Sequence, residues 1–218
     1  MTEPGSREVF EPGRLLAFTD GVFGVAITLL VIDLRLPPGS TNVSDADFLQ
    51  ALMAMGPKVY VFAFTFILVG VSWLAHHRKF SYIDKIDSPL LWLNLLFLMA
   101  LCLVPFASSV LSGYSSRFAF VLYATVMALL CILSTGLSAY GLRMPFLATR
   151  DLRPSQWQDM VFAPLLTGVV FMIAAGLALG GLERTAGWSL WAILPVMTFF
   201  GHRSRRAVQR SMQVNENS

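Results

Sequence analysis

The sequence has 218 residues, of which 56% are hydrophobic and 13% are charged, and its mean hydropathy is +0.64. A soluble globular chain carries about 25% charged residues, so this composition excludes an ordinary soluble domain and predicts an integral membrane protein. The net charge of +3 is no sign of nucleic-acid binding in so apolar a chain, and we expect membrane lipids as partners instead. The two cysteines, Cys102 and Cys131, lie in apolar runs without the spacing of a metal site.

Six apolar runs meet or approach the roughly 20 residues that a membrane-spanning helix needs. In chain order they are 15–36, 59–76, 90–112, 118–142, 161–181 and 188–200. None shows the alternation of a membrane β-barrel. We therefore predict an all-α fold with six transmembrane helices, divided into a cytoplasmic tail (1–13), a six-helix transmembrane domain (14–202) and a basic cytoplasmic tail (203–218).

The segment between the first two runs contains a further predicted helix. Pro37, Pro38 and Gly39 end the first helix. Ser44 precedes Asp47 at the spacing of a capping box, so we predict a short amphipathic helix over 45–55 on the outer face. In the fifth run, Gly176 and Gly180 form a GxxxG pair, which is a candidate packing face.

The distribution of Lys and Arg predicts the orientation in the membrane. With the N-terminus inside, twelve of the 16 basic residues fall in cytoplasmic segments and four fall outside. An even number of helices then places both termini in the cytoplasm. The N-terminal segment lacks the basic start and short apolar core of a signal peptide, so we expect the first helix to remain in the mature protein.

An aspartate, Asp20, interrupts the inner third of the first run. A carboxylate near the bilayer centre costs roughly 2.5–3.5 kcal/mol on insertion scales, so such a residue usually has partners. Polar side chains predicted at the same depth are Arg14, Thr19, Trp73, His76, His77 and Asn94. We expect a buried network of Asp20, Thr19, one histidine, Trp73 and Asn94. The alternative is an Asp20 that is solvated at the cytoplasmic interface.

The outer half of the first run carries an aliphatic stripe. Val25, Thr28, Leu29 and Ile32 recur at i, i+3, i+4 and i+7, so they share one face of a helix. Asp20 lies five residues before Val25, which places it about 140° around the helix. The acidic residue and the stripe therefore face different surroundings. Periodicity alone assigns the stripe to ordinary core or lipid contact.

We expect neither enzyme activity nor a metal or other cofactor. His76 and His77 are adjacent, so they point about 100° apart on a helix and make a poor chelate with Asp84 and Asp87. The sequence holds no HExxH, GxSxG, P-loop or GxGxxG motif. It also lacks the TVGYG filter loop of potassium channels and an Arg-repeat voltage sensor.

Three patterns near the predicted cytoplasmic side resemble those of a known family. They are Arg14-x-x-x-Phe18-Thr19-Asp20, Trp73-x-x-His76-His77-Arg78-x-Phe80 and Leu91-Trp92-Leu93-Asn94. The first resembles the RxxxFSD signature of the transmembrane protein 175 family, the endosomal and lysosomal potassium channel and its prokaryotic relatives. Thr19 replaces the serine of this signature and keeps the hydroxyl. The resemblance covers at least residues 14–94, and the number of helices extends it over the chain.

The resemblance implies a potassium-preferring cation channel, with K⁺ as the permeant ion, in a prokaryotic plasma membrane. A single six-helix repeat implies a homotetramer in which the first helix of each subunit lines a central pore. The family's hydrophobic constriction falls on Val25, its hydroxyl position on Thr28, and further aliphatic layers on Leu29 and Ile32. Family members usually carry isoleucine or leucine where this chain has Val25.

In this scheme the motif residues serve packing and assembly rather than ion binding. They are Arg14, Phe18, Thr19, Asp20, Trp73, His76, His77 and Asn94. Asp33 lies at the outer mouth, where it either concentrates cations or is an ordinary exposed charge at a helix end.

Two other functions stay open on sequence alone. One is a small proton-coupled secondary transporter, in which Asp20 and His76 or His77 relay protons. The sequence shows no inverted repeat in its support. The other is a purely structural membrane protein. Unitary currents distinguish a channel from the saturable, pH-driven flux of a transporter.

Overall fold

The computed structural model describes residues 9–10, 12–36, 43–144, 154–182, 185 and 193. These residues form six α-helices, one 3₁₀ helix and one pair of very short strands. The elements are β1 (Val9–Phe10), α1 (Pro12–Leu29), η1 (Leu30–Asp33), α2 (Asp45–Ala54), α3 (Gly56–Phe80), β2 (Ile86–Asp87), α4 (Ser88–Gly113), α5 (Arg117–Arg143) and α6 (Pro154–Leu179).

Five segments are long and apolar enough to cross a membrane: α1 with η1, α3, α4, α5 and most of α6. They correspond to the first five predicted runs, so this part of the prediction is confirmed. The sixth run, 188–200, lies outside the described residues except for Ile193, which is buried in the core.

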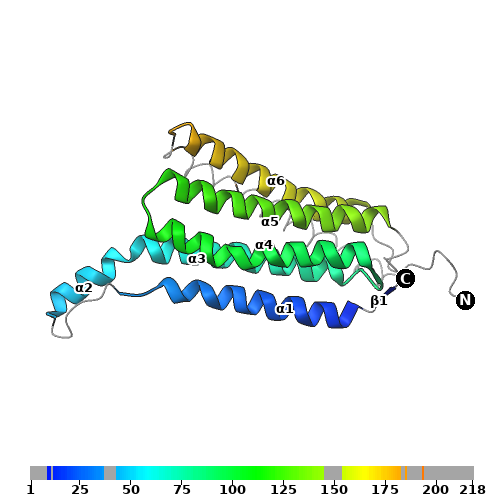
Figure 1. The fold of residues 1–218 in the computed structure, drawn as a ribbon, viewed down its shortest axis with the longest axis horizontal. Coiled ribbons are helices and arrows are strands. Elements are labelled where there is room, and N and C mark those ends of the chain that lie inside the picture. The colour runs from blue at the N-terminus through cyan, green and yellow to red at the C-terminus, as the bar shows by residue number, and fades with distance from the viewer. Residues whose placement is uncertain are drawn as a thin grey trace, which may run out of the picture.

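The predicted helix between the first two spans is confirmed as α2. Ser44 Oγ accepts a hydrogen bond from the backbone N–H of Asp47 at 3.2 Å and donates to the Asp47 carboxylate at 2.6 Å. This side chain therefore caps the helix as the spacing predicts. Figure 1 shows α2 extending beyond the end of the bundle, and all its side chains are at least partly exposed.

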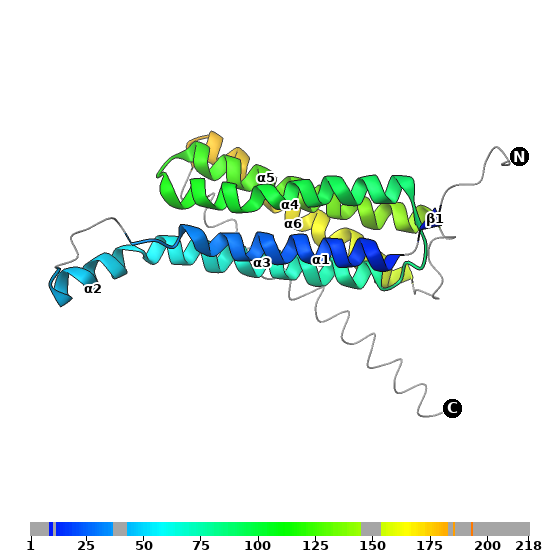
Figure 2. The same ribbon diagram turned by 60° about the horizontal axis from the view of Figure 1, so that its bottom comes forward.

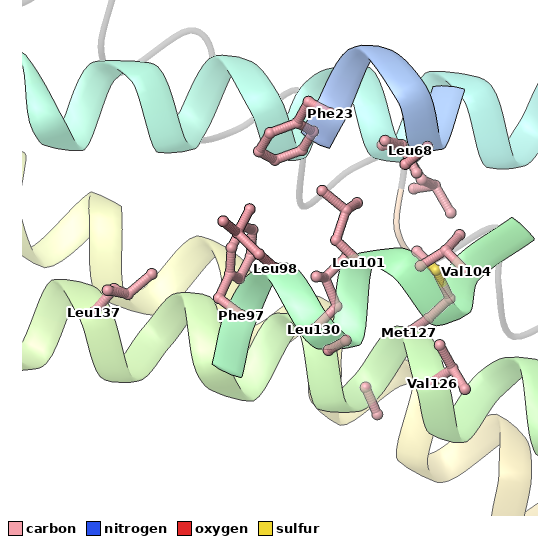
Figure 3. Packing of buried hydrophobic residues seen from close by; sticks show 14 of the residues in the cluster. Phe23, Leu68, Phe97, Leu98, Leu101, Val104, Val126, Met127, Leu130 and Leu137 are labelled. Atoms are coloured by element: carbon pink, nitrogen blue, oxygen red, sulfur yellow. The ribbon is translucent and has the colours of Figure 1, made fainter. Parts of the chain in front are cut away.

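The membrane-spanning helices run up and down in two layers. α1 and α3 lie in one layer and α4 and α5 in the other, and α6 packs against α5 (Figure 1 and Figure 2). The core lies between the layers, where Phe23 of α1 and Leu68 of α3 face the side chains of α4, including Leu98 and Leu101 (Figure 3). One side of α1 is thus packed, and the residues on its other side are exposed.

A strand pairing that the sequence did not predict lies at the end of the bundle opposite α2. β1 pairs with β2 in antiparallel register, with Val9 opposite Asp87 and Phe10 opposite Ile86. Asp87 caps α4 by accepting from the backbone N–H of Leu90 at 3.1 Å, and its other oxygen accepts from the Tyr140 hydroxyl of α5. The segment just before α1 is thereby held against the start of α4.

Among the described glycines of α6, Gly168 approaches α5 most closely, rather than the GxxxG pair. A Cβ on Gly168 would lie 3.0 Å from the Cβ of Cys131, which is closer than packed carbon atoms normally come. A Cβ on Gly176 would meet open space, and one on Gly180 would touch only carbonyl oxygens of its own helix. Within the described part of the chain, the GxxxG pair is not a packing face.

We therefore expect Gly168→Ala to destabilise the α5–α6 contact by about 1–3 kcal/mol, the usual cost of overpacking. Gly176→Ala is the matched control on the same helix: it makes the same change in helix propensity without the close contact, so it should not lower stability. Apparent melting temperatures of the two purified variants in detergent test this. Equal melting temperatures would contradict the close approach at Gly168.

Candidate functional site

The packed face of α1 fixes its orientation in the bundle. Thr19, Phe23, Ala26 and, in η1, Leu30 are buried at spacings of three and four residues. The Phe23 ring lies 5.9 Å from the ring of His76 in α3 and 5.9 Å from that of Phe97 in α4. This face of α1 therefore fills the angle between α3 and α4.

The four residues predicted to line a pore are all exposed. Val25, Leu29 and Ile32 are 58%, 42% and 46% exposed, and Thr28 is exposed as well. They follow one another from α1 into η1. A largely aliphatic exposed face on a helix whose opposite face is packed is a surface for lipid or for another copy of the chain.

The Thr28 hydroxyl is directed to its own helix. Oγ1 donates toward the backbone oxygens of Gly24 and Val25, at 3.0 and 2.9 Å. Because a hydroxyl has one hydrogen and two lone pairs, this arrangement uses its donor and leaves acceptor capacity on the exposed face. Chemically, the Thr28 oxygen is suited to coordinate a cation.

The predicted polar network divides into a buried part and an exposed part. In the buried part, Asn94 Nδ2 donates to Thr19 Oγ1 at 3.1 Å, and Asn94 Oδ1 lies 2.8 Å from His76 Nε2. With the amide in this orientation, Nε2 of His76 carries the proton and donates it. One side chain of α4 thus binds α1 and α3 at once.

Aromatic rings enclose the imidazole of His76. It stacks on Phe80, with 4.5 Å between ring centroids, and on Phe97, with 5.2 Å. The Phe23 ring lies at a tilt beside it. This packing holds the ring in the plane that its hydrogen bond to Asn94 requires.

The exposed part of the network is centred on Asp20. Asp20 Oδ1 accepts from the indole N–H of Trp73 at 2.8 Å, and the Trp73 ring lies 5.8 Å from that of His77. The structure therefore places Asp20 beside Trp73 on the surface of the chain rather than with Thr19 and Asn94. Arg14 and Phe18 are exposed on α1 too.

A buried lysine joins α3 to α5. Lys79 follows the predicted span 59–76 and is counted by sequence among the basic residues of the cytoplasmic segments, which the structure corrects. Lys79 is 2% exposed, and its Nζ donates to the backbone oxygen and to Oγ of Ser134, at 2.6 and 2.7 Å. Side chains on a helix lean toward its N-terminus, so this lysine reaches back into the bundle. The sequence could have indicated this burial, because Lys79 follows the buried His76 by three residues and so lies on the same face of the helix.

A second contact between α3 and α5 was also missed by sequence reasoning. The hydroxyls of Thr65 and Tyr123 share a buried hydrogen bond of 3.0 Å, and Ser108 of α4 lies 3.5 Å from Thr65 Oγ1. Each of the three hydroxyls lies on a different helix, so no spacing within one run indicates that they meet.

The acidic residues outside this network have structural or surface positions. Asp33 ends η1 and is half-buried, Asp84 is exposed, and Asp87 caps α4. Among the residues that the structure describes, no three His, Cys, Asp or Glu side chains are grouped to hold a metal ion.

These features define a multi-pass integral membrane protein with a helical bundle fold. Its fold is that of a crystal structure described as a lysosomal potassium-selective channel TMEM175 homolog from Chamaesiphon minutus, with a TM-score of 0.72 and 23% sequence identity. The similarity covers 86% of this chain and 97% of that one.

Sequence comparison adds a family match over part of the chain. Residues 14–105 match the family described as endosomal/lysosomal potassium channel TMEM175. A potassium channel of Streptomyces collinus is 35% identical over 127 residues, covering 56% of this chain and 60% of the relative. A potassium channel of Chamaesiphon minutus is 34% identical over 129 residues, covering 57% and 63%. The chain thus spans about three fifths of the length of these relatives. The family resemblance inferred from the motifs is confirmed.

Asn94→Leu should lower stability, because it leaves the imidazole N–H of His76 and the Thr19 hydroxyl without this partner in a buried site. Each buried group left unsatisfied costs about 1–3 kcal/mol. Asp20→Asn is the control, since its amide oxygen still accepts from Trp73. We expect a lower apparent melting temperature in detergent for Asn94→Leu only. Two variants of equal stability would contradict the importance of this bridge.

Lys79→Met should be at least as stable as the parent protein. Methionine keeps the apolar stem and removes the cost of burying an ammonium group. Ser138 Oγ lies 3.2 Å from the Ser134 carbonyl oxygen and 2.9 Å from that of Met160, so its one hydrogen is shared between them. Lys79→Ala empties the same space and should lose about 2–5 kcal/mol. A Lys79→Met protein as unstable as Lys79→Ala would show that the ammonium itself stabilises the fold.

Proposed function

We propose that this protein is a potassium-preferring cation channel whose ion path is lined by the exposed face of α1 and η1. The observation that carries the proposal is the position of Val25, Thr28, Leu29 and Ile32, which form one uncovered face while the opposite face is packed. The family match and the two relatives named as potassium channels support potassium as the permeant ion.

The proposed assembly is a homotetramer, as the family resemblance implies for a chain with a single six-helix repeat. Four copies of α1 then surround a central axis, and the exposed faces meet there instead of lipid. The excess of Lys and Arg on one side favours cytoplasmic termini, and bacterial relatives favour a prokaryotic plasma membrane.

In this assembly, rings of Val25, Leu29 and Ile32 form a hydrophobic constriction that gates by dewetting. The Thr28 oxygen supplies an acceptor within it, because its hydrogen is shared with backbone carbonyls. Selectivity arises from the cost of removing water from the ion, which the width of the rings and the four hydroxyl oxygens determine. Because valine is smaller than the isoleucine or leucine usual at this position in the family, the ring of Val25 side chains is wider than theirs.

The inner half of α1 has a different role, which is to hold the pore face in its direction. Thr19 is tied to α4 through Asn94, and Asp20 is tied to α3 through Trp73. Asp20 and His76 thus have different hydrogen-bond partners, so the structure gives no specific support to a proton relay between them. We therefore favour the channel over the transporter.

Recordings in planar bilayers test the pore assignment. Val25→Ala should raise conductance and lower the preference for K⁺ over Na⁺. Thr28→Val keeps the shape of the side chain but removes its oxygen, and should lower that preference too. If the lost contact is worth about 1 kcal/mol, the permeability ratio of K⁺ to Na⁺ should change about fivefold.

Ile67→Ala is the control, because Ile67 is an exposed aliphatic residue on α3 rather than α1. It should leave both properties unchanged. If Val25→Ala and Thr28→Val both matched the parent channel, the pore assignment would be wrong. Saturable, pH-driven flux without unitary currents would instead indicate a transporter.

A further inference from the structure

Arg35 is folded back over the end of η1. Its Nε donates to the backbone oxygen of Ile32 at 2.9 Å, and its own backbone N–H donates to the oxygen of Asp33 at 2.9 Å. Two hydrogen bonds thus place this residue at the helix end, and its side chain is exposed. The carbonyl that it binds belongs to the outermost residue of the proposed pore wall.

The charges at this helix end have opposite signs. A helix C-terminus carries a partial negative charge of about half an elementary charge, and Asp33 adds a full one. Both attract cations. The guanidinium group of Arg35 stays charged at every physiological pH, and its hydrogen-bond partner here is a carbonyl, not the Asp33 carboxylate. Its positive charge therefore acts at the same opening as the charges that attract cations.

We propose that Arg35 sets the electrostatic potential at the outer mouth of the pore, where it offsets the attraction that Asp33 and the helix end exert on cations. The proposal rests on the proposed channel function. In a tetramer, four guanidinium groups lie around the opening. Surface charge then enriches cations at the outer opening much less than Asp33 and the helix end would alone, and discrimination between cations is left to the constriction.

Ionic strength separates this effect from a change in pore shape. The screening length is about 30 Å at 0.01 M salt and about 3 Å at 1 M, so a surface-charge effect is large in the first and absent in the second. Arg35→Gln should raise inward single-channel K⁺ conductance about two- to tenfold at low salt, since a charged mouth enriches counter-ions. At 1 M the conductance should equal that of the parent.

Two further variants identify the cause. Arg35→Lys keeps the charge but lacks the Nε donor, and should conduct like the parent. Lys58→Gln removes a positive charge in the first turn of α3, at the same end of the bundle but off the pore helix, and should have a smaller effect than Arg35→Gln. An unchanged low-salt conductance in Arg35→Gln, or an Arg35→Lys channel that behaves like Arg35→Gln, would overturn the proposal.

A chemical readout does not depend on current. Leu36 is 42% exposed next to Arg35, and Leu36→Cys can be labelled in a background with Cys102→Ser and Cys131→Ala. Cationic and anionic methanethiosulfonate reagents are compared by mass spectrometry. Arg35→Gln should raise the ratio of cationic to anionic labelling rates, and an unchanged ratio would overturn the proposal. A raised ratio in a chain that passes no K⁺ would refute the channel function while assigning the potential at this helix end to Arg35.

Discussion

Asn94 is the side chain on which the arrangement of the first membrane helices depends. Apolar side chains gain little when they leave lipid for another helix, so close packing and polar contacts must hold a membrane bundle together. The Asn94 amide reaches from α4 to Thr19 of α1 and to His76 of α3, and so binds both members of one layer to the other. Lys79 and Thr65 extend this attachment from α3 to α5. Because the bond from Asn94 to Thr19 fixes the rotation of α1, it decides which face of α1 is left uncovered.

The features that followed from the sequence are those with a local physical cause. Hydropathy located five membrane helices, and the Ser44–Asp47 spacing located the start of α2. The unpredicted features depend on position around a helix or on distant partners. A lysine near the end of a membrane helix normally extends to the lipid headgroups. Lys79 instead points into the bundle, and the sequence does not show this direction. Depth alone suggested that Asp20 joins Thr19 and Asn94, whereas rotation around α1 separates them. A two-residue strand such as β1 is too short for any periodicity.

Three polar side chains along α1 each have a hydrogen-bond partner within the chain. Thr19 is bound by Asn94, Asp20 by Trp73, and the Thr28 hydrogen by the helix backbone. Among the described residues, no buried side-chain nitrogen or oxygen lacks a partner. The uncovered face of α1 therefore presents methyl groups and an acceptor oxygen rather than unmet donors. Such a surface suits a passage for cations, because it offers little that would hold an anion.

The change from α1 to η1 at Leu30 gives the uncovered face two different pitches. An α-helix turns about 100° per residue, whereas a 3₁₀ helix has three residues per turn and rises about 2.0 Å per residue. Side chains three positions apart therefore eclipse one another in a 3₁₀ helix, so η1 turns Ile32 toward the position directly beyond Leu29, the last residue of α1. In an uninterrupted α-helix the same residue would be turned aside by about 60°. Leu29 and Ile32 thus lie nearly in line along the helix axis, whereas Val25 is rotated around the axis from Leu29, as residues of an α-helix are.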